Sequence, residues 1–332
     1  MKNTASYLLV GCVNVVLLLL TLTGCVKDIP GNNVGTTGNE FAIYLVANVD
    51  SQNLYSLTNS NLSELELEDK PWLSLKDIDY YDSSSHYIYL EDRTFTLDVD
   101  TKKSFVKPFV VVASGERCYL GYFVSMASSF LPQAPYVHYP SFLADDVIAI
   151  ENPISDGAID MRNDPRIIEA FIKADKFNPG LRITLNEARV ISRAEVVTMS
   201  YSFTITNESD DPIYVPDPDK MGSDLFHYYT NGLLLTKVEN PHESVWASQK
   251  PTISLEPITK WDIDWFTRLG SHESFDRTVV LSGYPEFDNG VYSCQFTYSG
   301  LDWILIDERT LSDGRIWIGK VDSNVIEIVI EN

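Results

Sequence analysis

The chain has 332 residues, and its 25 lysine and arginine residues face 47 aspartate and glutamate residues, a formal net charge of −22 at pH 7. A surface this acidic repels the phosphates of nucleic acids and anionic lipid headgroups within a Debye length of roughly 8 Å. Nucleic acid is therefore excluded as an expected partner. The hydrophobic content of 44% is enough for proper cores, and the length fits two domains after a leader and a linker.

The N-terminus carries a short apolar segment that ends next to a cysteine. Lys2 is followed by an almost unbroken apolar run from Tyr7 to Leu22. A membrane-spanning helix needs about 20 apolar residues, so the shorter run predicts a cleaved signal peptide over residues 1–24. An ordinary secretory signal and an N-terminal membrane helix are the alternatives.

The end of this run resembles the lipobox of bacterial lipoproteins. It reads Leu22-Thr23-Gly24-Cys25, a branched aliphatic residue and two small residues before a cysteine. The resemblance implies that cleavage precedes Cys25 and that fatty acid is attached to its thiol and its new amine. Several acyl chains make attachment to a membrane effectively permanent. Val26 stands where an aspartate would favour the inner membrane, so the resemblance favours the outer membrane of the cell envelope.

Residues 25–40 combine the lipidated cysteine with a glycine- and asparagine-rich stretch that has no apolar periodicity. We expect a flexible tether that reaches about 50 Å when fully extended, at ~3.3 Å per residue. Beyond the tether the chain holds only Cys118 and Cys294. Two cysteines are too few for a disulfide-stapled scaffold, and we expect them to be free, buried thiols.

Residues 41–155 are expected to form a small, mainly β domain. The segment 94–100 alternates apolar and polar residues, which is typical of a half-buried strand. The run 109–124 predicts a hairpin that turns at Ser114-Gly115-Glu116. Ser74 and Asp77 have the spacing of a capping box, which predicts a helical turn.

Residues 156–180 contain the one helix that the sequence predicts. Asp164 fits the N-cap and Pro165 the first helical position, whereas Asn178-Pro179-Gly180 provides a stop. We expect this helix to join or buttress the two β domains.

Residues 181–332 are expected to form an antiparallel β-sandwich. In 195–206 apolar and polar residues alternate strictly, and further short strands follow without interleaved helices, including one at 261–266. Asp288, Gly290, Tyr292 and Cys294 then have a spacing that resembles strand F of immunoglobulin domains. The resemblance implies an Ig-like architecture and a tyrosine corner at Tyr292. The segment 195–206, the best strand-B candidate, has no cysteine, so the disulfide of that family is absent.

The fold class that we predict is therefore mainly β, with a small N-terminal β domain, one linking helix and a C-terminal Ig-like antiparallel β-sandwich. The sandwich architecture implies no particular function, because it hosts many. Motifs for catalytic zinc, for a serine nucleophile elbow and for phosphate binding do not occur.

Asp217, Asp219 and Asp224 surround Gly222 in a pattern faintly like a calcium loop, since hard cations bind several carboxylate oxygens on a tight turn. The EF-hand pattern fails, because Met221 occupies a position that should bind the ion. A proline-stiffened loop between strands is the alternative. A Ca²⁺ ion is the only cofactor that the sequence suggests.

The loops 125–140 and 224–232 are richer in aromatic residues than loops need to be. We predict that Phe130, Tyr136, Phe226 and Tyr228 contribute to a partner surface, although packing between domains would bury the same residues. The sequence thus favours an envelope lipoprotein that acts as a non-enzymatic binding module for a protein or a glycan. An envelope hydrolase whose site forms only in three dimensions and a proteinase inhibitor are the alternatives.

Overall fold

The computed structural model describes ten stretches of the chain, all within one compact unit, Thr36–Asn332. We call residues 41–180 the N-terminal lobe and residues 181–331 the C-terminal sandwich. The fold is mainly β, as predicted. The signal peptide, Cys25, the tether and the strand expected at 94–100 lie outside the described residues. The described stretches are 41–49, 54–91, 105–139, 145–153, 160–193, 196–230, 232–247, 261–286, 288–300 and 309–331.

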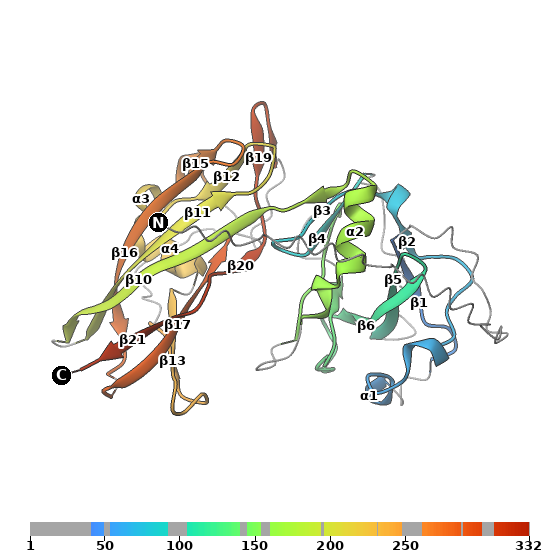
Figure 1. Cartoon of the computed structure of the whole chain (residues 1–332), viewed down its shortest axis with the longest axis horizontal. Coiled ribbons are helices and arrows are strands. Elements are labelled where there is room, and N and C mark those ends of the chain that lie inside the picture. The colour runs from blue at the N-terminus through green and yellow to red at the C-terminus, as the bar shows by residue number, and fades with distance from the viewer. Residues whose placement is uncertain are drawn as a thin grey trace, which may run out of the picture. The chain divides into compact units, whose positions relative to one another are not determined.

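The first sheet of the N-terminal lobe has the strand order β2-β1-β5-β6-β7 (Figure 1). The predicted hairpin is confirmed as β5 and β6, which turn at Ser114 and Gly115. These two residues have φ values of 53° and 78°, and positive φ at both central residues is typical of a type I′ hairpin turn. The strands are β1 (Ala42–Leu45), β2 (Leu73–Ser74), β5 (Val106–Ala113), β6 (Glu116–Ser125) and β7 (Tyr136–Tyr139), and α1 (Leu54–Leu57) lies between β1 and β2 in the chain.

The second sheet of this lobe has the order β8-β4-β3-β9 and is mixed, because β9 runs parallel to β3. The predicted helical turn is confirmed as a 3₁₀ turn before β3. There the Asp77 carboxylate accepts hydrogen bonds from the backbone N–H and the hydroxyl of Ser74, at 2.9 and 2.8 Å. The strands are β3 (Ile78–Asp82), β4 (Tyr87–Leu90), β8 (Val147–Ala149) and β9 (Phe177–Asn178).

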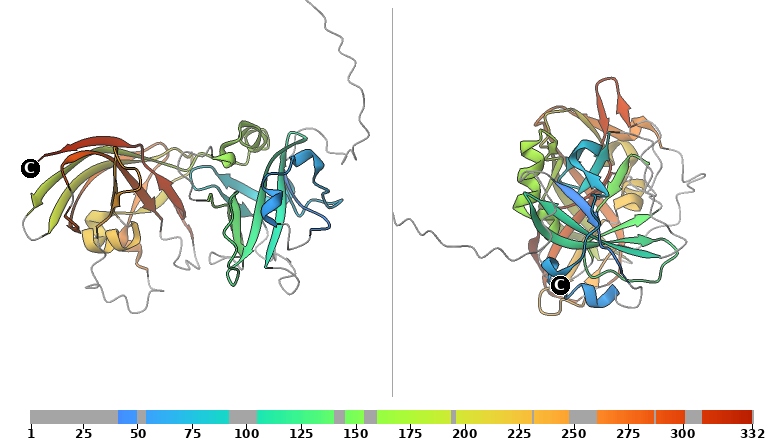
Figure 2. Two further views of the ribbon diagram at one scale, coloured as in Figure 1. Left: turned by 90° about the horizontal axis from the view of Figure 1, so that it is seen from below. Right: turned by 90° about the vertical axis from the view of Figure 1, so that its right-hand side faces the viewer.

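The predicted helix is confirmed as α2 (Pro165–Lys173). Asp164 caps it by accepting a hydrogen bond from the backbone N–H of Arg166 at 2.9 Å. Its apolar face is buried, and Phe171 stacks on Tyr81 of β3 with ring centroids 4.6 Å apart. Figure 2 shows α2 beside the strands of the N-terminal lobe, which it buttresses.

The C-terminal sandwich pairs a β10-β11-β16 sheet with a β14-β13-β17 sheet, to which β20 and β21 add. Their side chains share one core, in which Met199, Tyr201 and Phe203 of β11 are buried as the alternation predicts. The pairings correspond to strands A-B-E and C-F-G of an Ig-like sandwich. The strands are β10 (Leu181–Arg193), β11 (Val197–Asn207), β13 (Leu233–Lys237), β14 (Ser244–Val245), β16 (Ser274–Tyr284), β17 (Gly290–Ser299), β20 (Lys320–Asp322) and β21 (Ile326–Ile330).

The tyrosine corner is present in β17. The hydroxyl of Tyr292 donates to the backbone carbonyl of Asp288 at 3.1 Å, which fixes the turn that enters the strand. Cys294 is buried and free, as predicted, whereas the free thiol of Cys118 is only partly buried.

A further four-stranded sheet, β15-β12-β19-β18, departs from the expected antiparallel sandwich, because β12 and β19 run parallel. The expected strand at 261–266 is instead a 3₁₀ turn, Ile263–Trp265, that leads into β15. Among the described residues no helix is long and apolar enough to cross a membrane. The strands of this sheet are β12 (Ile213–Pro216), β15 (Phe266–Leu269), β18 (Thr310–Leu311) and β19 (Gly314–Ile316).

Two short helices occur where the sequence predicts loops and no interleaved helices. Asp217 caps α3 (Pro218–Met221) by accepting from the backbone N–H of Asp219, and Pro218 fits the first turn. Gly222, with a φ of 81°, separates α3 from α4 (Ser223–Thr230). The prediction was wrong because the proline and glycine that indicate a loop here also start and end short helices.

Candidate functional site

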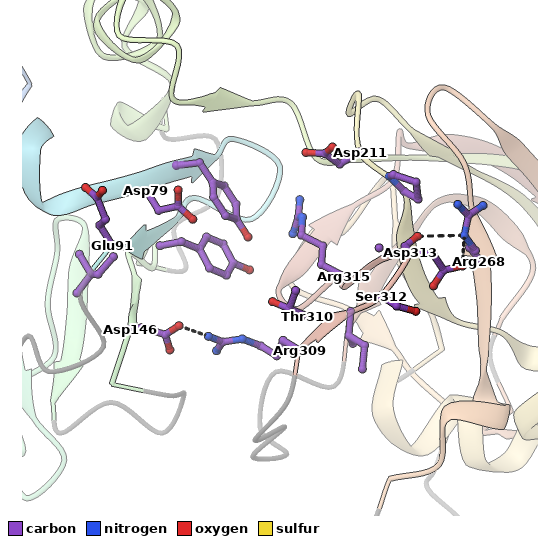
Figure 3. Close-up of a pocket in the computed structure, with 16 residues that line it drawn as sticks. Asp79, Glu91, Asp146, Asp211, Arg268, Arg309, Thr310, Ser312, Asp313 and Arg315 are labelled. Carbon is purple, nitrogen blue, oxygen red and sulfur yellow. Dashed lines mark hydrogen bonds and ion pairs between the residues drawn. The ribbon is translucent and has the colours of Figure 1, made fainter.

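A pocket of about 630 Å³ lies at the junction between β3 and β4 of the N-terminal lobe and the β18–β19 hairpin of the C-terminal sandwich (Figure 3). This volume is within the range of small-molecule sites. We call it the junction pocket. It is lined by Asp79, Tyr80, Tyr89, Leu90, Glu91, Asp146, Asp211, Pro212, Arg268, Arg309, Thr310, Ser312, Asp313, Gly314, Arg315 and Ile316.

Apolar packing fixes the two walls of the pocket. Tyr87, Tyr89 and Val147 of the N-terminal lobe share one buried cluster with residues of the C-terminal sandwich, among them Phe266 and Ile316. Because β-strands alternate their side chains, burial of Ile316 on one face of β19 leaves Arg315 on the other. The hairpin is thereby held with its charged side chains along the pocket.

Two stacked tyrosines form one side of the pocket. Tyr80 and Tyr89 lie directly opposite each other in the β3–β4 register, and their ring centroids are 4.2 Å apart. Burial raises the pKa of Tyr80 to about 12 and that of Tyr89 well above its ordinary value. Both hydroxyls therefore stay protonated at neutral pH and can act as neutral hydrogen-bond donors.

Arg315 of β19 reaches across to this tyrosine pair. Its guanidinium carbon lies 5.0 Å from the ring centroid of Tyr80, and its Nη2 lies 3.4 Å from Oδ2 of Asp82. Burial opposes the charge, but the neighbouring Tyr80 and Asp82 raise the pKa of Arg315 further above its usual range, so it stays cationic. Nη1 of Arg315 is buried and has no hydrogen-bond partner among the described residues. The buried hydroxyl of Tyr89 likewise makes no hydrogen bond that meets the usual distance and angle limits with a described residue.

Asp82, behind Arg315, is fully buried at the end of β3. Its Oδ1 accepts from the backbone N–H and the hydroxyl of Ser84, at 3.1 and 2.6 Å, and from the backbone N–H of Ser85 at 3.2 Å. Its Oδ2 accepts from Nε1 of Trp317 at 3.2 Å. Both oxygens of Asp82 therefore accept hydrogen bonds from groups other than Arg315. Arg315, in contrast, keeps an N–H group that Asp82 does not accept from.

Two further arginines of the pocket are neutralised by carboxylates. Arg309 donates to Asp146 at 2.5 Å, with both side chains largely buried, and Arg268 pairs with Asp313 at 3.1 Å (Figure 3). The remaining acidic side chains of the lining are exposed and make no ion pair with another described residue. These are Asp79, Glu91 and Asp211.

A histidine elsewhere in the N-terminal lobe lies between a hydroxyl and a carboxylate. Nδ1 of His86 hydrogen-bonds to the Tyr81 hydroxyl at 2.6 Å, and its Nε2 lies 3.7 Å from Asp160. Burial lowers the pKa of His86 to about 3. His86 and Tyr81 are buried and neither lines the junction pocket, so this arrangement gives no support to a hydrolytic site.

The predicted calcium ligands do not form a cation site. Both oxygens of Asp217 are engaged by Arg277, at 2.7 Å to Nε and 2.6 Å to Nη2, and Oδ2 also accepts from the hydroxyl of Thr267. Asp219 lies 3.1 Å from the same arginine, and Asp224 lies in the first turn of α4. Among the residues that the structure describes, no group of three or more suitable side chains could hold a metal ion.

The four aromatic residues predicted as a partner surface do not form one. Phe226 has no exposed surface and packs in the sandwich core against Phe203 and Phe296, so it is not available to a ligand. The other three are partly buried: Phe130 and Tyr136 pack against one cluster of the N-terminal lobe, and Tyr228 packs against a different cluster. Phe130 packs on Tyr122, Tyr136 donates to the Glu151 carboxylate at 3.1 Å, and Tyr228 packs on Tyr229.

The sequence reasoning missed the residues of the junction pocket. A faint signal exists in Arg315, a basic residue inside a short apolar strand of a strongly acidic chain. No model of a known protein family matches the sequence, and no curated protein matches it.

Proposed function

We propose that this chain is a lipid-anchored binding protein of the bacterial cell envelope that takes its ligand in the junction pocket. The resemblance of Leu22-Thr23-Gly24-Cys25 to a lipobox supports a lipid on Cys25 and an outer-membrane location. The tether that follows would hold the folded part clear of the lipid headgroups. We expect a ligand from the envelope, because the lipid anchor would hold the protein there. The net charge of −22 disfavours nucleic acid as a partner.

One observation supports the binding function above the others. The junction pocket combines a volume of about 630 Å³ with charged side chains from both lobes. Concave sites with a few convergent polar groups are where small ligands bind. The hydrolase and proteinase-inhibitor alternatives have no comparable observation in their favour among the described residues.

The binding function is tested by filling the pocket. Thr310 is exposed and lines the pocket, so Thr310→Trp places an indole in it, whereas Thr278→Trp on the exposed face of β16 is the matched control. Calorimetric titration with envelope peptides and oligosaccharides should find at least one ligand that binds the wild type and the control but not Thr310→Trp. A ligand that binds all three proteins equally would contradict this site.

The anchor is tested separately. Growth with labelled palmitate should label the wild-type product and leave Cys25→Ser unlabelled, and only the wild type should partition into detergent. An unlabelled wild type would remove the lipid anchor from the proposal without affecting the pocket.

A further inference from the structure

The charges that line the junction pocket divide into a paired set and an unpaired set. Arg268 and Arg309 each have a carboxylate partner in the lining. Asp79, Glu91 and Asp211 have none among the described residues. The rim of the pocket therefore keeps three uncompensated negative charges, which favour a ligand with a positive charge.

A single cationic side chain inside the pocket lacks a good partner. Arg315 contacts Asp82 at 3.4 Å, beyond the usual length of a charge-assisted hydrogen bond, and its Nη1 has no hydrogen-bond partner among the described residues. Asp82 already accepts from Ser84, Ser85 and Trp317. The guanidinium can thus turn toward a ligand without leaving that carboxylate unsatisfied.

Figure 3 shows the side chain of Arg315 extending into the space between Asp79 and Asp211. The lining of the pocket therefore combines a cationic hydrogen-bond donor, Arg315, with exposed carboxylate acceptors. A planar guanidinium suits a carboxylate, because two parallel N–H groups match its two oxygens. Exposed carboxylates suit an ammonium group.

We propose that the junction pocket binds an amino-acid-type zwitterion, a free amino acid or a short peptide, with its carboxylate on Arg315 and its ammonium group on Asp79, Asp211 or Glu91. This inference rests on the proposed binding function and names its ligand class. A ligand with only negative charge would face the three rim carboxylates. A neutral sugar would leave the charge of Arg315 and those of the rim carboxylates without a partner.

The ligand class is tested by calorimetric titration of the full chain in detergent. The probes are the peptide Ala-Lys-Ala, its C-terminal amide, its form acetylated on both amines, free lysine, and N,N′-diacetylchitobiose as the neutral glycan. Ala-Lys-Ala should bind best. The amide should bind roughly 10- to 100-fold more weakly, the range expected for the loss of a hydrogen-bonded charge, and acetylation should also weaken binding.

Variants assign the two ends of the ligand. Arg315→Gln should weaken binding of Ala-Lys-Ala by roughly 10-fold or more and should leave binding of its amide unchanged. Asp79→Asn and Asp211→Asn alter exposed side chains, so they should fold normally and weaken only the probes that carry an ammonium group. Arg189→Gln, which removes a positive charge from a side chain 67% exposed on β10, is the control and should change nothing.

The possible results distinguish an error in the ligand class from an error in the proposed binding function. Equal affinity for the acid and the amide in both the wild type and Arg315→Gln would overturn the carboxylate assignment. Binding of the glycan alone would overturn the zwitterion and leave the pocket as a binding site. Comparison of free lysine with the peptide tells whether the ligand is an amino acid or a peptide end, whereas failure of all these probes would overturn the zwitterion class.

Discussion

Two buried aspartates in this molecule each pair with an arginine, and the two pairs differ in geometry. In the C-terminal sandwich, Arg277 donates to both oxygens of Asp217 at 2.7 and 2.6 Å. At the junction of the lobes, Arg315 touches one oxygen of Asp82 at 3.4 Å, and its Nη1 has no partner among the described residues. The same two residue types can therefore form a tight ion pair in one place and a loose one, with an unused donor, in another.

The difference lies in what else satisfies each aspartate. Burial alone would raise the pKa of Asp217, and hydrogen bonds from Arg277 and Thr267 hold it below its ordinary value. Besides Arg277, Asp217 accepts only from the backbone N–H of Asp219 and the hydroxyl of Thr267 among the described residues, so it depends more on its arginine. Asp82 is held by Ser84, Ser85 and Trp317, so its arginine is not needed for that purpose.

The largest expected effect comes from breaking the pair in the sandwich. Arg277→Gln leaves Asp217 buried and without its charged partner, which should lower the free energy of unfolding by about 3–5 kcal/mol. Urea denaturation measures this loss, and the exposed Arg189→Gln is the control. A loss below about 1 kcal/mol would mean that Arg277 is not structural.

The second-largest effect is expected from the loss of the hydroxyl of Ser84, which donates to Asp82. Ser84→Ala removes a hydroxyl that donates to Asp82 at 2.6 Å and accepts from the backbone N–H of Leu181 at 3.0 Å. The loss of both bonds should lower the free energy of unfolding by about 1–3 kcal/mol. Ser202→Ala, on the outer face of β11, should be nearly neutral in the same urea titration. Equal effects would contradict the role given to Ser84.

A third prediction concerns acid stability. The pKa of His86 is about 3 in the folded protein and 6.5 ordinarily, so the unfolded state takes up the proton first as the pH falls. Stability is therefore full above pH 6.5 and is lost progressively between pH 6.5 and about 3. In His86→Asn the slope of unfolding free energy against pH in this window should fall by up to about 1.4 kcal/mol per pH unit. An unchanged slope would show that His86 does not titrate in this way.

The smallest effect should come from the tyrosine corner. Tyr292→Phe removes the hydroxyl that donates to the Asp288 carbonyl and keeps the ring in the core. The loss of one hydrogen bond should lower the free energy of unfolding by about 0.5–1.5 kcal/mol. A change in thermal unfolding well above that range would mean that Tyr292 does more than fix the turn.

The sandwich was largely predictable from sequence, and the junction pocket was not. Alternation in β11, the cap at Asp164 and the hairpin at Ser114-Gly115 are local patterns, and local patterns determine local structure. Asp82 and Arg315 are 233 positions apart, and nothing local in either segment indicates the other. Of the aromatic residues chosen from sequence, Phe226 fills the sandwich core and the others are partly buried, because ring size alone does not separate core packing from ligand binding.

If Arg315 is held for a ligand and not for the fold, its replacement should cost the fold little. The most direct measurement is the free energy of unfolding of Arg315→Gln without ligand, by urea denaturation beside Arg277→Gln. The loss should be clearly smaller than that of Arg277→Gln, because Asp82 keeps its hydrogen bonds from Ser84, Ser85 and Trp317 and a buried unpaired N–H is removed. A loss of about 3–5 kcal/mol, equal to that expected for Arg277→Gln, would make Arg315 a structural residue and not one held for a ligand.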